Sequence, residues 1–106
     1  MTTRVVHVNS QEWKDTPEDQ RVYIGRAVPR RGFKASKWAN PFKISATCTR
    51  AQAVTRYSLH IMNDMALMDA LHELKDKTLG CWCAPDECHG DVLAALAEIE
   101  EDRVKP

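Results

Sequence analysis

The sequence lacks the long apolar stretches of a membrane protein. Its 106 residues contain no run of about 18 apolar residues, so we expect no transmembrane helix and no membrane partner. The first eight residues also lack the apolar centre and small-residue cleavage site of a secretory signal peptide. We therefore expect a cytoplasmic protein with reduced cysteines. In that setting, metal binding or catalysis explains clustered cysteines better than disulfide bonding does.

Acidic residues are absent from the middle of the chain. No Asp or Glu occurs from Gln20 to Asn63, whereas nine basic residues fall there: Arg21, Arg26, Arg30, Arg31, Lys34, Lys37, Lys43, Arg50 and Arg56. From Asp64 onward, eleven acidic residues outnumber four basic ones, so the formal net charge of zero conceals two halves of opposite charge. Either the halves neutralise each other, or the basic stretch binds an anion such as a nucleotide, a phosphate or a nucleic acid.

Repeats, low-complexity segments and linkers are also absent, and the length suits one domain, residues 1–106. β-Branched and alternating runs predict strands at 4–8, 21–26 and 78–83. Apolar spacing predicts helices at 49–62, 65–74 and 92–101, and 9–20 is expected to be a loop with about one helical turn. The order β-β-α-α-β-α favours a small, single-domain, Rossmann-like α/β fold with about three mainly parallel strands and three helices. Because three strands make a small sheet, edge pairing into a homodimer is a further expectation.

Three of the four cysteines gather between the third strand and the last helix. Strand alternation would place Cys81 and Cys83 on one face, and the next loop could bring Cys88 and His89 back toward them. Four such ligands suit zinc, although Cys-x-Cys-x4-Cys-His is not a usual zinc spacing. One hypothesis is therefore a zinc-stabilised, non-catalytic module that binds a host protein or a nucleic acid.

A second hypothesis uses the same corner without a metal. Cys88 to Asp91 fall where a helix is expected to begin, and free amide groups there attract anions and lower the pKa of a thiol. Cys88 would supply a reactive thiol and His89 a general acid or base, while Asp91 would either cap the helix or orient His89. Gly90 would let a ligand approach the backbone closely. A plainer alternative is a small buried cysteine cluster.

The basic stretch includes a long irregular segment, 27–42, of the kind that is usually functional when it lies in a compact domain. Arg26 precedes it at a strand end, where ligands bind in open α/β sheets. Lys37 and Asn40 offer a cation and an amide to the same ligand. The alternative is a structural turn that Trp38 and Phe42 hold against the core.

Three motifs together resemble a family of short phage and bacterial domains of unknown function. They are Tyr23-Ile-Gly-Arg26, Ser36-Lys-Trp-Ala-Asn-Pro-Phe42 and Leu79-Gly-Cys-Trp-Cys-Ala-Pro-Asp-Glu-Cys-His-Gly-Asp-Val-Leu93, and the resemblance spans residues 5–96. Ala39 departs from the glycine expected in the loop. The resemblance implies a phage or mobile-element setting in a host cytoplasm, and it implies no particular activity.

Our leading expectation is an intracellular domain that binds a nucleotide or another phosphorylated or anionic ligand at the Cys-His-Gly-Asp corner. Arg26, Lys37 and Asn40 would hold the anion, and Cys88, His89 and Asp91 would line the reacting or recognising end. The pattern allows an enzyme of nucleotide metabolism and equally a binding domain. The zinc module, with Cys81, Cys83, Cys88 and His89 as ligands, is the alternative.

Overall fold

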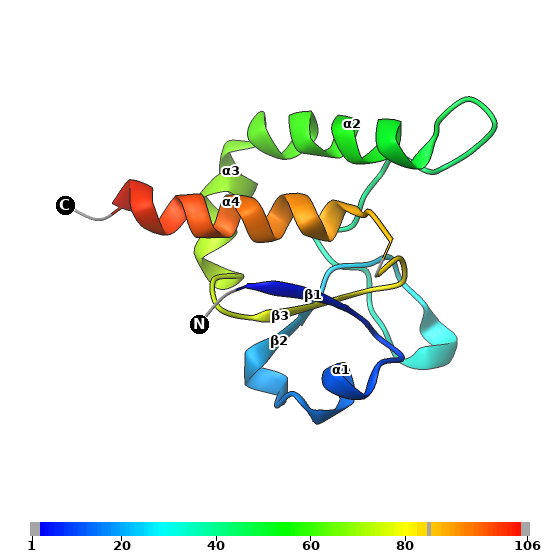
Figure 1. Cartoon of the computed structure of the whole chain (residues 1–106), viewed down its shortest axis with the longest axis vertical. Helices are drawn as coiled ribbons and strands as arrows, with labels where there is room; N and C mark the ends of the chain where they lie inside the picture. The colour runs from blue at the N-terminus through cyan, green and yellow to red at the C-terminus, as the bar shows by residue number, and fades with distance from the viewer. Residues whose placement is uncertain (1–2, 85, 105–106) are drawn as a thin grey trace.

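A three-stranded parallel sheet forms the centre of the protein (Figure 1). The computed structural model describes residues 3–84 and 86–104, with the backbone alone beyond Ile99. The strands are β1 (Arg4–His7), β2 (Arg21–Tyr23) and β3 (Thr78–Cys81), arranged in the order β1-β3-β2. Val5 and Val22 both pair with Leu79, so the last strand in sequence is the central one. Its four residues are all buried, as expected for a parallel strand that is covered on both faces.

Four α-helices surround the sheet, one more than expected from the sequence. They are α1 (Gln11–Asp15), α2 (Arg50–Met62), α3 (Met65–Asp69) and α4 (His89–Val104), with short 3-10 helices at Glu18–Gln20, Pro29–Arg31 and Ala70–Glu73. Figure 1 shows α1 on one side of the sheet and α2, α3 and α4 on the other. Helix α4 packs on β1 and β3, and α2 packs on α4. None of the helices described is long and apolar enough to cross a membrane.

Helix α2 begins with the capping box that its sequence predicts. Gln52 N–H donates to Thr49 Oγ1 over 3.2 Å, and Thr49 N–H donates to Gln52 Oε1 over 2.9 Å. These bonds satisfy two amide groups that a helix start leaves free. Helical spacing in the sequence predicts an inward face of Ala51, Val54, Tyr57, Ser58 and Ile61. The buried residues are Ala53, Tyr57 and Ile61, and Ala51 is exposed. Ala53, Tyr57 and Ile61 are four residues apart, so they lie on one face of the helix, and this is the face that packs on the core.

Two element boundaries differ from the sequence prediction at the cysteine-rich corner. Strand β3 ends at Cys81 and not at Cys83, because the chain turns there and Asp86 N–H donates to the Cys83 carbonyl over 2.9 Å. Helix α4 begins at His89, three residues before the expected start. Cys83 therefore lies in a turn after the strand, and strand alternation does not set its direction.

The face of the sheet that carries α1 is filled by one aromatic residue. Trp13 is buried against Val6 and Val8, and its ring lies directly over Gly80 of the central strand. A Cβ atom at Gly80 would come within 2.5 Å of that ring. The short α1 can therefore cover this face only because β3 has no side chain at that point.

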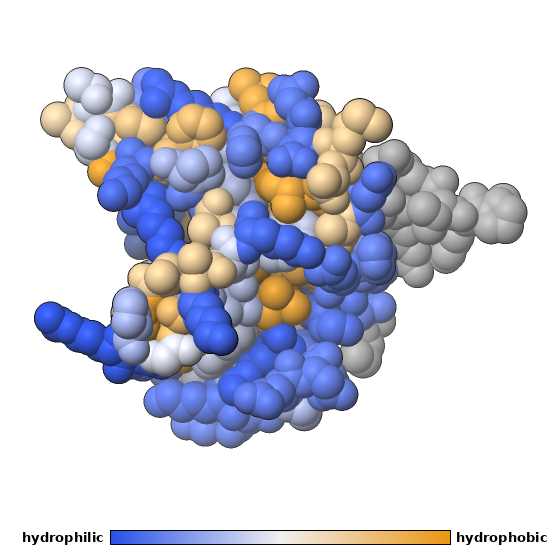
Figure 2. Space-filling model, turned by 180° about the vertical axis from the view of Figure 1, so that it is seen from behind, coloured by the Kyte–Doolittle hydropathy of each residue, from blue (hydrophilic) through white to orange (hydrophobic). Residues whose placement is uncertain are grey.

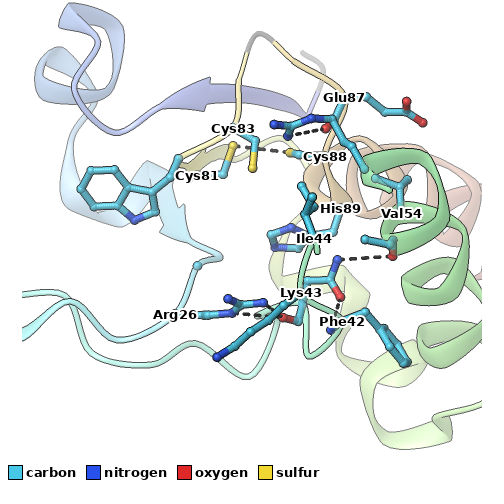
Figure 3. A pocket seen from close by; sticks show the side chains of 15 residues that line it. Arg26, Phe42, Lys43, Ile44, Val54, Cys81, Cys83, Glu87, Cys88 and His89 are labelled. Carbon is cyan, nitrogen blue, oxygen red and sulfur yellow. Dashed lines mark hydrogen bonds between the residues drawn. The ribbon is translucent and has the colours of Figure 1, made fainter. Parts of the chain in front are cut away.

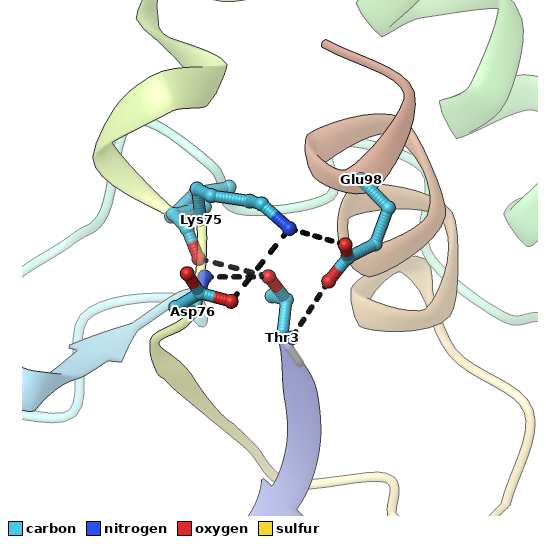
Figure 4. Close-up of polar contacts among 5 residues, drawn as sticks. Thr3, Lys75, Asp76 and Glu98 are labelled. Carbon is cyan, nitrogen blue, oxygen red and sulfur yellow. Dashed lines mark hydrogen bonds and ion pairs between the residues drawn. The ribbon is translucent and has the colours of Figure 1, made fainter. Parts of the chain in front are cut away.

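A polar network closes the amino ends of the strands (Figure 4). Thr3 N–H donates to Glu98 Oε1 over 2.9 Å, and Asp76 N–H donates to Thr3 Oγ1 over 2.8 Å. Lys75 Nζ also donates to Glu98 Oε2. The hydrogen bonds from Lys75 and from Thr3 lower the pKa of the Glu98 carboxyl to about 2. Helix α4 is thus tied through Glu98 to the start of β1.

Candidate functional site

A pocket of about 390 Å³ opens at the carboxyl ends of β2 and β3. Figure 2, a view from behind, shows the outline hollowed at the left, where this end of the molecule lies. Figure 3 shows the side chains that line the cavity. The lining combines three basic side chains, three cysteines and an apolar wall: Gly25, Arg26, Asn40, Phe42, Lys43, Ile44, Arg50, Ala53, Val54, Cys81, Trp82, Cys83, Glu87, Cys88 and His89.

Two buried thiols in contact form the floor of the pocket. Cys81 Sγ and Cys88 Sγ lie 3.4 Å apart, and Ala84 N–H points to Cys81 Sγ over 3.4 Å. Hydrogen bonding from Cys88 and from backbone amides lowers the pKa of Cys81 to about 6. The same shared hydrogen bond and burial raise the pKa of Cys88. The pair is therefore suited to hold one proton between two sulfur atoms, with Cys81 as the thiolate.

Cys88 also caps helix α4, with sulfur in the place of the usual hydroxyl. Gly90 N–H donates to Cys88 Sγ over 3.2 Å, and Cys88 N–H donates to Asp91 Oδ2 over 3.2 Å. The pair of hydrogen bonds resembles a capping box, except that the cap side chain accepts from the second helical residue, Gly90, and not from the third. The Asp91 carboxylate thus accepts the Cys88 N–H at the helix start, and in the described part of the chain it forms no hydrogen bond to His89. Asp91 does not line the pocket.

His89 faces the pocket but is held by the backbone of the chain that leaves β2. Its Nε2 lies 2.8 Å from the Ile24 carbonyl, and since a carbonyl only accepts, Nε2 carries the proton. The ring packs edge-on against Tyr57 at 4.8 Å between centroids. Burial lowers the pKa of His89, so the imidazole is neutral at pH 7. Within the described chain no hydrogen bond joins His89 to Cys88 or Asp91.

Gly90 has a packing role at this corner. A Cβ atom there would lie 2.8 Å from Ile24 Cδ1 and 2.9 Å from Val5 Cγ1. The absence of a side chain lets the start of α4 sit against β1 and the end of β2. Gly90 does not line the pocket. The space beside this glycine is occupied by core side chains and is not open to a ligand in the cavity.

The three anion-binding candidates of the basic stretch have different positions. Arg26 lies at the rim, where its Nη2 donates to the Asn40 carbonyl over 2.9 Å. The Asn40 side chain lines the pocket, but its Oδ1 accepts from Phe42 N–H over 2.9 Å and its Nδ2 faces the Ala53 carbonyl at 3.4 Å. Lys37 lies outside the pocket and pairs with Glu73 at 2.8 Å. Arg26 is thus the cation of this trio that reaches the pocket.

Two further cations, Lys43 and Arg50, line the pocket and were not singled out from the sequence. Arg50 is the first residue of α2, and its Nη1 donates to the Glu87 carbonyl over 3.2 Å. A hydrogen bond with Cys83 raises the pKa of Arg50. The signal available in the sequence was the position of Arg50 directly after the Thr49 cap, at a helix start within the acid-free stretch.

The proposed zinc ligands converge only in part. Among residues 3–84 and 86–104, no three His, Cys, Asp or Glu side chains form a group that could hold a metal ion. Cys81 and Cys88 are in contact, whereas Cys83 interacts with Arg50 and the Nε2 of His89 is bonded to Ile24. Zinc binding stays a prediction, which metal analysis of the purified protein can test.

The fold and the pocket define a small α/β protein with a cavity at the carboxyl ends of parallel strands. A family model described as "Domain of unknown function (DUF4326)" matches residues 6–99, and the chain belongs to this family. It is similar to "Uncharacterized protein R718" of Acanthamoeba polyphaga mimivirus, with 32% identity over 111 residues that cover 95% of this chain and 85% of the relative. No solved structure matches. Membership of a family of unknown function is confirmed, while the three motifs quoted for it stay a prediction.

Proposed function

We propose that this domain binds a nucleotide or a related phosphorylated molecule in the pocket at the ends of β2 and β3. One observation carries the proposal: Arg26, Lys43 and Arg50 line a largely apolar cavity, and none of them forms an ion pair with a carboxylate in the described part of the chain. Unpaired cations at a concave site attract anionic ligands. A cavity of about 390 Å³ also lies within the size range of small-ligand sites.

The charge pattern supports the same ligand class. Neutralisation between the basic and acidic halves was the main alternative, and Lys37 with Glu73 is the one ion pair that joins them among the residues described. Eight of the nine cations in the acid-free stretch therefore lack a carboxylate within 4.0 Å in that part of the chain. An external anion accounts for the cations at the pocket better than neutralisation within the protein does.

The architecture supports a ligand at this end of the sheet. We infer a minimal Rossmann-like fold, in which ligands bind outside the carboxyl ends of the parallel strands. The amino-terminal ends of α2 and α4 lie at this same end (Figure 1), and their helix dipoles favour negative charge. Phe42, Ile44 and Val54 supply an apolar wall that suits a base or another flat, weakly polar group.

Any reaction in the pocket would draw on Cys81 rather than on a Cys88–His89–Asp91 arrangement. The Asp91 carboxylate accepts the Cys88 N–H at the start of α4, and the Nε2–H of His89 donates to the Ile24 carbonyl. Cys81 is the thiol whose pKa is lowered, and it lines the cavity. We therefore assign the candidate nucleophile of an enzyme of this kind to the Cys81 sulfur, with Cys88 as its proton partner.

Calorimetry with a ligand panel tests the proposal. The panel contains nucleosides, their mono-, di- and triphosphates, sugar phosphates and inorganic phosphate. We expect phosphorylated members to bind and free nucleosides to bind at least about tenfold more weakly, since a charge-assisted hydrogen bond contributes about 1.5–3 kcal/mol. Arg50→Gln and Lys43→Gln should each weaken binding, while Lys77→Gln, at the amino end of β3, should not. Failure of every member to bind, or equal binding by all three variants, would remove the proposal.

A further inference from the structure

A second cationic surface adjoins the pocket on the segment Val28–Lys34, here called the basic turn. Val28 and Phe33 form an antiparallel bridge with N–H to carbonyl distances of 2.9 and 3.2 Å. Between them lie the 3-10 helix Pro29–Arg31 and Gly32, whose φ of 77° places it in the left-handed region. The turn is therefore a hydrogen-bonded unit that presents Arg30, Arg31 and Lys34.

Aromatic contacts fix the basic turn beside the pocket. The ring of Phe33 stacks on Tyr23 at 4.3 Å and meets Trp82 edge-on at 5.8 Å. Trp82 Nε1–H in turn donates to the Tyr23 hydroxyl over 2.8 Å. Because Trp82 also lines the pocket, the turn and the cavity share a wall. The two cationic surfaces are thus neighbours on either side of Trp82.

The cations of the basic turn lack carboxylate partners among the residues that the structure describes. Arg31 is held in position, because its guanidinium lies over the Trp82 ring at 5.4 Å and its Nη2 donates to Asn9 Oδ1 over 2.8 Å. Arg30 and Lys34 are exposed. Together with the three cations at the pocket, six positive charges gather at this end. The pocket lining carries one carboxylate, Glu87, and none of the six cations forms an ion pair in the described part of the chain.

Resting on the proposed function, we infer that the physiological ligand is a single-stranded nucleic acid. Its terminal nucleotide occupies the pocket, and the basic turn binds the phosphates that follow. Six cations exceed the charge of one nucleotide monophosphate, which is about −2 at pH 7. A strand adds one charge per nucleotide along a basic surface. A paired base is stacked within its duplex, whereas an unpaired terminal base is free to enter a cavity against an apolar wall.

Fluorescence anisotropy separates this inference from the proposed function. The probes are a labelled single strand of about eight nucleotides, as DNA and as RNA, a blunt duplex of the same sequence, and the matching mononucleotide as competitor. We expect the single strand to bind at least about tenfold more tightly than the mononucleotide, with steep salt dependence, and the mononucleotide to displace it.

The double variant Arg30→Gln/Lys34→Gln tests the basic turn. It should weaken strand binding about tenfold and reduce the slope of log K against log salt by about 1.4, at about 0.7 per phosphate contact. Mononucleotide affinity should not change, since neither residue lines the pocket. The control Arg4→Gln/Lys77→Gln removes equal charge at the amino ends of the strands and should leave strand binding unchanged. Circular dichroism checks that each variant is folded.

The alternative outcomes are distinct. Equal affinity for strand and mononucleotide would overturn this inference and leave the proposed function in place. Tighter binding of the duplex would also overturn it, because a duplex offers the pocket no free terminal base. Equal losses in the test and control variants would mean that net charge alone governs binding, and would overturn the inference as well. If neither strand nor mononucleotide binds, the proposed function fails together with it.

Discussion

The Sγ atoms of Cys81 and Cys88 lie 3.4 Å apart and join the end of the central strand to the cap of helix α4. Cys88 Sγ therefore makes two contacts. It touches Cys81 Sγ on the pocket floor, and it accepts the Gly90 N–H at the helix start. Ser supplies a stronger cap acceptor in less volume, whereas Ala supplies none. These two substitutions therefore separate the cap from the thiol contact.

We expect Cys88→Ala to reduce the free energy of unfolding by about 1 kcal/mol more than Cys88→Ser does, because only Ala leaves the Gly90 N–H without its acceptor. Urea denaturation of the two variants measures the difference. Cys83→Ala is the matched control, since Cys83 is a partly exposed thiol of the same corner outside the helix start. Equal loss in both Cys88 variants would show that the sulfur contact, and not the cap, stabilises this corner.

Gly80→Ala should lower the free energy of unfolding by about 1–3 kcal/mol, the usual range for overpacking a core. The added Cβ atom would come within 2.5 Å of the Trp13 ring. This ring is buried between α1 and the sheet, so it has little room to move away. In a double-mutant cycle, the Gly80→Ala change should cost much less in a Trp13→Leu background. Additive costs would contradict a direct Trp13–Gly80 contact.

Stability should fall at acid pH through Glu98. Its folded pKa of about 2 lies below the ordinary value of 4.5, so its contribution is fully present above about pH 4.5 and is lost as the pH falls toward 2. Chemical denaturation between pH 5 and pH 2 measures the slope. Glu98→Gln should flatten that slope, and Glu18→Gln, outside the polar network of Thr3, should leave it unchanged. An unchanged slope in Glu98→Gln would contradict the assignment.

Metal analysis tests the zinc alternative directly. We expect protein purified without added zinc to hold less than one zinc ion per chain and to keep its melting temperature in a chelator. The reason is the direction of the donors: the Nε2 of His89 bonds to Ile24 and Cys83 interacts with Arg50, which leaves the Cys81–Cys88 pair. Stoichiometric zinc that is lost together with the fold on chelation would favour the zinc module instead.

Much of the fold could be predicted from local patterns. The α/β class and the Thr49 capping box follow from runs and spacings within single segments. The parallel pairing of β2 with β3 follows from the order of the elements, because helices connect these two strands. The single helical turn expected within residues 9–20 is α1, but its place over the sheet was not predicted, because Trp13 is its one apolar residue and that residue packs on the distant Gly80. The sequence around Trp13 and the sequence around Gly80 do not indicate that these two residues are in contact.

The position of the candidate site agrees better with the sequence prediction than the hydrogen-bond partners of its residues do. The carboxyl edge of the sheet, Arg26 and the cysteine-rich corner were all predicted to lie together, and the pocket contains them. Lys37 was selected by sign of charge, but Glu73, 36 residues later, pairs with it. His89 and Cys88 are neighbours in sequence that hydrogen-bond to different elements. Side-chain direction at a turn depends on such distant partners, which sequence spacing does not encode.

The strand order determines when the sheet can form during synthesis of the chain. Strands β1 and β2 both pair only with β3, which begins at residue 78. During synthesis no part of the described sheet can form until three quarters of the chain has been made, and the pocket, whose floor lies between β3 and α4, is completed later still. A nascent or truncated chain that stops before this point has two unpaired strands and lacks the pocket, so the pocket is present only where the whole described sheet has assembled.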